Sequence, residues 1–188
     1  MQAARQKWRS QQSDWDASRL VFIDESGLNT KMTRSYGRAP RNRRCVGAVP
    51  HGHWHTNTFI AALRTSGLTS PWLLDGPMNG ASFLVYIQKV LGPDLRKGDI
   101  VICDNLSSHK VAGVREALQE IGVQLIYLPP YSPDLNPIEM AFAKLKAHLR
   151  KKEPRTKDEL LTAVTEAILD FPPEQCTNFV RHSHYTPN

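Results

Sequence analysis

The sequence has no long apolar run, few cysteines and no internal repeat, and each absence excludes a class of protein. No stretch approaches the roughly 18 apolar residues of a membrane span. The polar N-terminus lacks the apolar centre of a secretory signal peptide. The 3 cysteines, Cys45, Cys103 and Cys176, lie far apart, which argues against a disulfide framework or a zinc knuckle. We therefore expect a reduced, cytoplasmic protein with no membrane partner.

The composition is that of a globular protein with a basic balance. The chain has 188 residues, of which 40% are hydrophobic and 22% charged. This length suits one domain that is large enough to bury a core. Lys and Arg number 24 against 18 Asp and Glu, for a net charge of +6. Such an excess suggests a polyanionic partner, with nucleic acid as the first candidate.

Hydrophobic patterning predicts an α/β fold, a mixed sheet flanked by helices. Residues 1–18 read as a polar lead-in. An antiparallel start followed by alternating strands and helices is typical of such sheets, in which function collects at the carboxyl ends of the strands. The predicted strands are 20–23, 45–50, 56–63, a brief one within 71–80, 100–103 and 123–128. The predicted helices are 81–91, 110–122, 138–152 and 156–171, with a short one in the tail.

Two of the predicted strands end in a carboxylate. Leu20–Ile23 is followed by Asp24, and Ile100–Cys103 by Asp104. A carboxylate at the end of a buried strand is partly desolvated and needs a cation or a donor. Either residue alone could cap a turn or pair with a basic side chain. Together they favour a site for Mg²⁺ or Mn²⁺, which prefer hard oxygen ligands.

A third carboxylate, Glu139, lies at the start of a predicted amphipathic helix. Asn136 is the expected N-cap and Pro137 the first helical residue, so Glu139 could simply complete a capping box. The same helix places Lys146 and Arg150 on the flank of Glu139. A carboxylate beside basic residues that hold phosphate is what a nuclease site needs.

Basic residues cluster in the loop 31–44 and along the predicted helix 138–152. The loop 31–44 carries five arginines beside Tyr36, which suits contacts with the phosphate backbone of DNA. A solvated surface is the alternative for these charges. His109 could contact phosphate or cap a turn, and the motif HGHWH at 51–55 fits a hairpin turn better than a zinc site. The possible DNA-binding residues are Arg34, Arg38, Arg41, Arg43, Arg44, His109, Lys110, Lys144, Lys146 and Arg150.

Three motifs together resemble a known family. FIDES at 22–26, CDNLSSHK at 103–110 and LPPYSPDLNPIEMAFAKLK at 128–146 look like the catalytic domain of mariner-type bacterial insertion-sequence transposases, which are DDE superfamily endonucleases. The 34 residues between Asp104 and Glu139 are a spacing typical of that family. The resemblance implies a ribonuclease-H-like fold and a catalytic, metal-binding triad of Asp24, Asp104 and Glu139. It also implies two Mg²⁺ or Mn²⁺ ions, with Asp24 bridging them.

The implied activity is cleavage at DNA element ends, followed by strand transfer into target DNA. A ribonuclease-H-like nuclease or resolvase without strand transfer is the alternative enzyme, and a DNA-binding module with structural acids is the alternative outside enzymes. The catalytic domain is expected at 19–188. The resemblance also implies a homo-oligomer on DNA and an N-terminal helix-turn-helix part that is missing here or encoded elsewhere.

Overall fold

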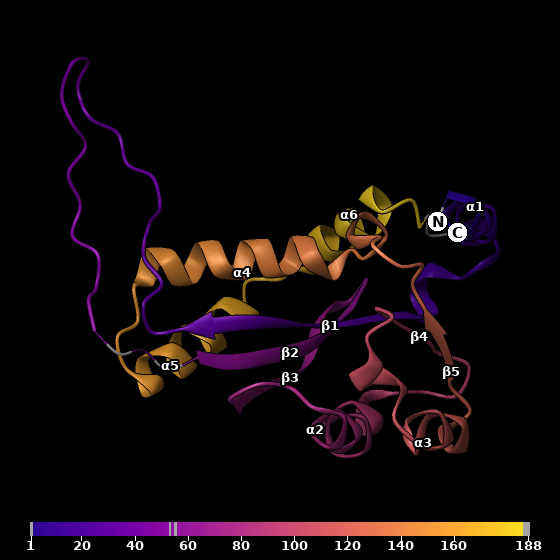
Figure 1. The fold of residues 1–188 in the computed structure, drawn as a ribbon. Coiled ribbons are helices and arrows are strands. Elements are labelled where there is room, and N and C mark those ends of the chain that lie inside the picture. The colour runs from indigo at the N-terminus through magenta and orange to yellow at the C-terminus, as the bar shows by residue number, and fades with distance from the viewer. Residues whose placement is uncertain (1, 53, 55, 186–188) are drawn as a thin grey trace.

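The computed structural model describes residues 2–52, 54 and 56–185, which form a mixed sheet with helices on both faces (Figure 1). Its strand order is β3-β2-β1-β4-β5. The first three strands pair antiparallel, and β4 and β5 run parallel to β1. This confirms the predicted α/β fold class. The strands are β1 (Leu20–Asn29), β2 (Thr56–Arg64), β3 (Gly67–Asp75), β4 (Ile100–Cys103) and β5 (Gln124–Tyr127).

Two apolar clusters, one on each face of the sheet, hold the layers together. On one face Phe22 and Phe59 pack against Phe142 and the other apolar residues of the long helix α4. On the opposite face Val21 and Val101 contact the cluster formed by α2 and α3. Because neighbouring residues of a strand point to opposite faces, a continuous apolar run serves both layers. The helices are α1 (Gln2–Gln11), α2 (Gly80–Val85), α3 (Val114–Ile121), α4 (Ile138–Lys152), α5 (Lys157–Ile168) and α6 (Pro173–His182).

Local signals in the sequence fix several helix ends as predicted. Gly122 follows α3 in the left-handed conformation, with φ of 80°, which glycine adopts without strain. Thr156 and Glu159 form the predicted capping box at the start of α5. The segment predicted as one helix at 81–91 instead changes from α2 to a π-helical turn over Tyr86–Leu91.

The predicted strand at 45–50 is wrong. These residues belong to the long connection between β1 and β2, which stands away from the body of the domain (Figure 1). Val46 and Val49 are 87% and 63% exposed. Both sides of β1 are already paired, by β2 and β4, and this short run pairs with no strand of the described sheet. By contrast, β1 and β3 are longer than predicted because their pairing with β2 continues.

The N-terminal residues contact the core rather than only leading into it. Trp8 on α1 is 5% exposed and Ala17 is 1% exposed, and both join the cluster on the α4 face. The zinc and hairpin alternatives for HGHWH involve His53 and His55, which lie outside the described residues. Within the described part of the chain, no helix combines the length and apolarity needed to cross a bilayer.

Candidate active site

The parallel pairing of β1 and β4 brings Asp24 and Asp104 side by side. The register pairs Leu20 with Ile100 and Phe22 with Ile102. Continued by two residues, it places Asp24 opposite Asp104, directly beyond the end of β4. Asp104 lies just beyond the end of β4 as predicted, but Asp24 lies in the middle of β1, which continues to Asn29 in its pairing with β2. The two carboxylates are nevertheless neighbours, because the parallel register holds them side by side.

Asp24 is partly buried and held by two hydrogen bonds. The backbone N–H of Glu25 donates to Asp24 Oδ1 at 2.8 Å, and Asn136 Nδ2 donates to Oδ2 at 2.8 Å. Burial raises the pKa of Asp24 to about 7, the backbone hydrogen bond opposes this, and the charges of Glu139 and Asp104 raise it further. Asp24 is thus a carboxylate whose ionised form lacks a compensating positive charge.

Asp104 is fixed through one of its oxygens. Its Oδ1 accepts from the backbone N–H of Leu106 at 3.2 Å and lies 2.6 Å from Nδ1 of His109. The other ring nitrogen of His109, Nε2, lies 2.9 Å from Oε2 of Glu25. The imidazole also stacks on Phe83, with ring centroids 4.2 Å apart. The turn contact predicted as an alternative for Asp104 therefore exists, and it leaves the second carboxylate oxygen outside these contacts.

His109 is almost fully buried between the two carboxylates. Burial alone would lower its pKa, but close polar contacts with Asp104, Cys103 and Glu25 outweigh this and raise it to about 12. The ring is therefore an imidazolium at neutral pH. Its burial speaks against the predicted contact with DNA phosphate and favours a role in positioning Asp104.

Glu139 reaches the site from the first turn of α4. The expected capping box is wrong: no side chain caps this helix, and Pro137 rather than Asn136 occupies the N-cap. Asn136 instead turns its amide to Asp24. Glu139 is exposed, and its backbone N–H donates to Asn136 O at 3.2 Å. The Glu139 side chain is thus available for chemistry rather than used in a cap.

One cavity of about 420 Å³ contains all three predicted catalytic carboxylates, Asp24, Asp104 and Glu139. The segments 104–106, 128–133 and 136 complete its wall. Tyr131 stands at this wall 87% exposed, with a φ of 54° that tyrosine rarely adopts. The cavity combines polar carboxylates with an exposed aromatic rim.

The residues at the cavity fit a hard divalent cation. The donors are carboxylate oxygens, and Asn136 Oδ1 is buried with no hydrogen-bond partner among the described residues. The pKa of Asp24 is raised mainly by burial and further by repulsion from nearby carboxylates, and a bound cation would oppose both effects. As the side chains stand, no three His, Cys, Asp or Glu residues of the described chain are grouped closely enough to hold one ion.

The predicted basic residues differ in their surroundings. The five arginines of the long connection, Arg34, Arg38, Arg41, Arg43 and Arg44, are all exposed. Lys144 is engaged within the domain, because its ammonium group donates to Asp170 O and to Gln175 Oε1. Lys110 is exposed and lies over the ring of Tyr127 at 5.5 Å, while Lys146 and Arg150 are half-buried on α4.

The sequence-based prediction missed Asn136 as a partner of Asp24 and Tyr131 at the cavity rim. Asn136 precedes a proline at a helix start, so its pattern is that of an N-cap, and a contact across 112 residues leaves no local signal. Tyr131 lies among three prolines, a pattern that predicts a turn but not an exposed ring beside a site.

The chain belongs to the DDE superfamily endonucleases, whose family model matches residues 19–161. Among solved structures, the fold is similar to a pre-cleavage Mos1 transpososome, with a TM-score of 0.78 and 18% identity over 98% of this chain and 58% of that one. It is also similar to the Mos1 strand transfer complex, with a TM-score of 0.69 and 22% identity over 97% and 54% of the two chains. The isolated catalytic domain of Mos1 mariner transposase matches with a TM-score of 0.61 and 17% identity over 91% and 78%.

The family model confirms the predicted DDE superfamily endonuclease domain, and the structural matches confirm its ribonuclease-H-like fold. The chain spans 58% of the length of the Mos1 chain in the transpososome. A search of curated proteins finds no match.

Proposed function

We propose that this domain catalyses metal-dependent phosphoryl transfer on DNA, as the catalytic part of an insertion-sequence transposase. Water attacks a phosphodiester at an element end, and the bond from phosphorus to the 3′ oxygen breaks. The freed 3′-hydroxyl then attacks a phosphodiester of target DNA and displaces its 3′ oxygen. The observation that carries the proposal is the convergence of Asp24, Asp104 and Glu139 on one cavity.

Asp24, Asp104 and Glu139 would hold two Mg²⁺ or Mn²⁺ ions. Paired-end complexes of Mos1 have been solved with Mg and with Mn, which supports this choice of metal. When bound, such ions supply Lewis-acid stabilisation of the phosphorane charge and lower the pKa of a coordinated water. In this chain, His109 orients Asp104 through Nδ1, and Asn136 orients Asp24 through its amide.

The exposed arginines of the long connection would bind the DNA backbone. Contacts between these charges and phosphate groups do not depend on the DNA sequence. The arginines would therefore position the duplex, and another part of the protein would select the element ends. Lys110, Lys146 and Arg150 would extend this contact, whereas Lys144 is occupied within the domain. We further infer that a homo-oligomer forms on paired DNA ends in the bacterial cytoplasm. A helix-turn-helix part outside this chain would select those ends.

Two products distinguish this proposal from a nuclease or resolvase. The purified chain is incubated with supercoiled plasmid, a labelled duplex with a free 3′-hydroxyl, and Mn²⁺. Plasmid nicking reports hydrolysis, and label attached to plasmid reports strand transfer. We expect both from the wild type. Nicking without any joining would favour the nuclease or resolvase.

Three variants test whether the acids are catalytic. Asp104→Asn and Glu139→Gln should reduce both products by about a hundredfold or more, since each removes metal-dependent stabilisation of several kcal/mol. Glu120→Gln, an exposed carboxylate on α3, is the matched control and should act like the wild type. Equal cleavage by the wild type and Asp104→Asn would contradict the assignment and favour a binding module whose acids are structural.

A further inference from the structure

The loop between β5 and α4, residues 128–137, has few backbone donors with which to form hydrogen bonds. It contains Pro129, Pro130, Pro133 and Pro137, and proline has no backbone donor. At its start, Leu128 N–H donates to Cys103 O at the end of β4 at 2.8 Å, but the later backbone hydrogen bonds are local: Leu135 N–H to Ser132 O at 3.1 Å and Asn136 N–H to Pro133 O at 3.0 Å. The position of residues 134 and 135 relative to the sheet therefore depends on side-chain packing and on contacts made by other segments.

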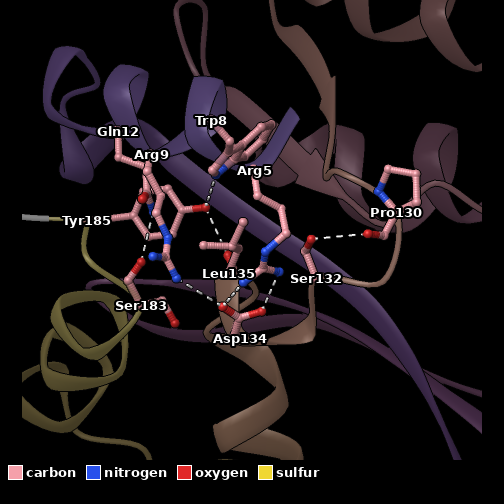
Figure 2. Close-up of polar contacts among 10 residues, drawn as sticks. All are labelled: Arg5, Trp8, Arg9, Gln12, Pro130, Ser132, Asp134, Leu135, Ser183 and Tyr185. Atoms are coloured by element: carbon pink, nitrogen blue, oxygen red, sulfur yellow. Dashed lines mark hydrogen bonds and ion pairs between the residues drawn. The ribbon is translucent and has the colours of Figure 1, made fainter. Parts of the chain in front are cut away.

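Helix α1 contacts this loop from one side through arginine side chains (Figure 2). The Arg5 guanidinium donates two parallel hydrogen bonds to Asp134, from Nη1 to Oδ1 at 2.8 Å and from Nη2 to Oδ2 at 2.6 Å. Nη2 of Arg9 lies 3.6 Å from the same carboxylate. A bidentate pair fixes orientation as well as distance. Asp134, in the middle of the short turn Pro133–Leu135, thus anchors the loop on α1.

The C-terminal segment contacts Leu135, the next residue of the loop. The Tyr185 hydroxyl, which is fully buried, donates to the backbone oxygen of Leu135 at 2.8 Å and accepts from Nε1 of Trp8 at 2.9 Å. Gln12 Nε2 donates to Ser183 O at 2.8 Å, which ties the two chain ends together. Figure 2 shows these contacts converging on the loop from the N-terminal and C-terminal segments.

Two residues of the candidate site follow shortly after Asp134 and Leu135. Asn136, which is 2% exposed, donates to Asp24, and Glu139 lies in the first turn of α4. A shift of Asp134 and Leu135 would move both of these side chains relative to β1. The ion pair itself lies near the surface, with side chains 27% and 49% exposed, and such pairs contribute little to global stability.

We propose that Arg5 and Tyr185 are positioning residues that hold residues 134 and 135, so that Asn136 and Glu139 face Asp24, and thereby set the affinity of the site for its divalent ion. This inference rests on the proposed function, because it assumes that the carboxylates bind a metal. It assigns to α1 and to the C-terminal segment a role in the chemistry rather than in folding alone.

The test measures Mn²⁺ binding by electron paramagnetic resonance of the free ion, with the full chain and without DNA. We expect Arg5→Met and Tyr185→Phe to weaken Mn²⁺ binding by about 3- to 10-fold, which is less than the roughly 10- to 100-fold cost of losing a direct partner of a metal ligand, because these residues act through the loop. Arg5→Lys, which keeps the charge but not the paired donors, should recover part of the affinity. The melting temperature of Arg5→Met should stay near that of the wild type.

The matched control is Lys152→Met. It removes the Lys152–Glu166 pair, which has a similar length of 2.7 Å but lies at the far end of α4, and it should leave Mn²⁺ affinity unchanged. If Arg5→Met and Tyr185→Phe bind Mn²⁺ like the wild type while Asp24→Asn does not, the positioning role is overturned and the metal site stands. If the wild type binds no better than Asp24→Asn, the proposed function itself fails. If Tyr185→Phe does not fold, Arg5→Met decides alone.

Discussion

The amide of Asn136 donates a hydrogen bond of 2.8 Å to Asp24 across the boundary between α4 and the sheet. This contact links the third sequence motif to the first. It places the start of α4, and with it Glu139, on the same cavity as the carboxylates of the adjacent parallel strands. Because Asn136 Oδ1 has no partner among the described residues, the same side chain also offers the cavity an acceptor.

Asn136→Ala should lower plasmid nicking by about tenfold in Mn²⁺, because Asp24 loses its orienting donor and α4 loses its link to β1. The comparison is Asn105→Ala, which removes an exposed amide from the wall of the same cavity. That change should lower nicking by less than about threefold. Similar losses in both variants would show that the contact with Asp24 has no special role.

His109 should remain protonated from pH 5 to pH 9, because its pKa is raised to about 12 by hydrogen bonds with carboxylates that outweigh its burial. The nitrogen NMR chemical shifts of the His109 ring report its protonation state directly. The urea-unfolded chain is the control, and its histidines should titrate near the ordinary pKa of about 6.5. A folded-state titration of His109 near that value would contradict the imidazolium between Asp104 and Glu25.

Local signals account for the parts of the fold that the sequence predicts well. Ile100–Cys103 is a continuous apolar run that ends in an acid, and it forms β4 beside β1. Gly122 and the Thr156–Glu159 box end and begin helices through contacts within a few residues. In each case the physical cause lies inside the segment.

The features that the sequence-based predictions missed share a non-local cause. The run 45–50 resembles a strand but pairs with no strand of the described sheet, and strand formation depends on such non-local pairing. His109 contacts Glu25 across 84 residues, so its burial has no signature near CDNLSSHK. Asp134 is anchored across 129 residues by Arg5, in a segment that reads only as polar. The sequence therefore predicts the three acids of the site, but not the side chains that hold them in place.

Asp24 should make the metal-free domain less stable as the pH rises. Its pKa is about 7 in the folded chain, mainly through burial, against an ordinary value of 3.8. Between those values the folded chain keeps a proton that the unfolded chain releases, so the free energy of unfolding falls as the pH increases from about 4 to about 7. Asp24→Asn has no such proton. In chelator it should exceed the wild type in stability by about 1–3 kcal/mol at pH 8, and by less at pH 5.

Thermal unfolding of both proteins in chelator at these two pH values tests whether Asp24→Asn is more stable than the wild type. Asp158→Asn, an exposed carboxylate on α5, is the control and should track the wild type at both. Added Mg²⁺ should stabilise the wild type but not Asp24→Asn, since only the wild type has the Asp24 carboxylate to bind the ion. A wild-type advantage over Asp24→Asn in chelator at pH 8 would contradict the raised pKa.

The long connection should contribute to DNA binding through its charge alone. Arg41→Gln combined with Arg43→Gln removes two exposed cations, and each lost phosphate contact should reduce the slope of log affinity against log salt by about 0.9. Binding to a duplex is measured by fluorescence anisotropy between 50 and about 200 mM salt, the range over which such contacts weaken strongly. Lys89→Gln with Lys97→Gln removes the same charge from exposed positions outside the long connection, and its slope should match the wild type. Because both double variants change the net charge equally, an equal loss of slope would assign the effect to overall charge, whereas a loss confined to Arg41 and Arg43 places the DNA on the long connection.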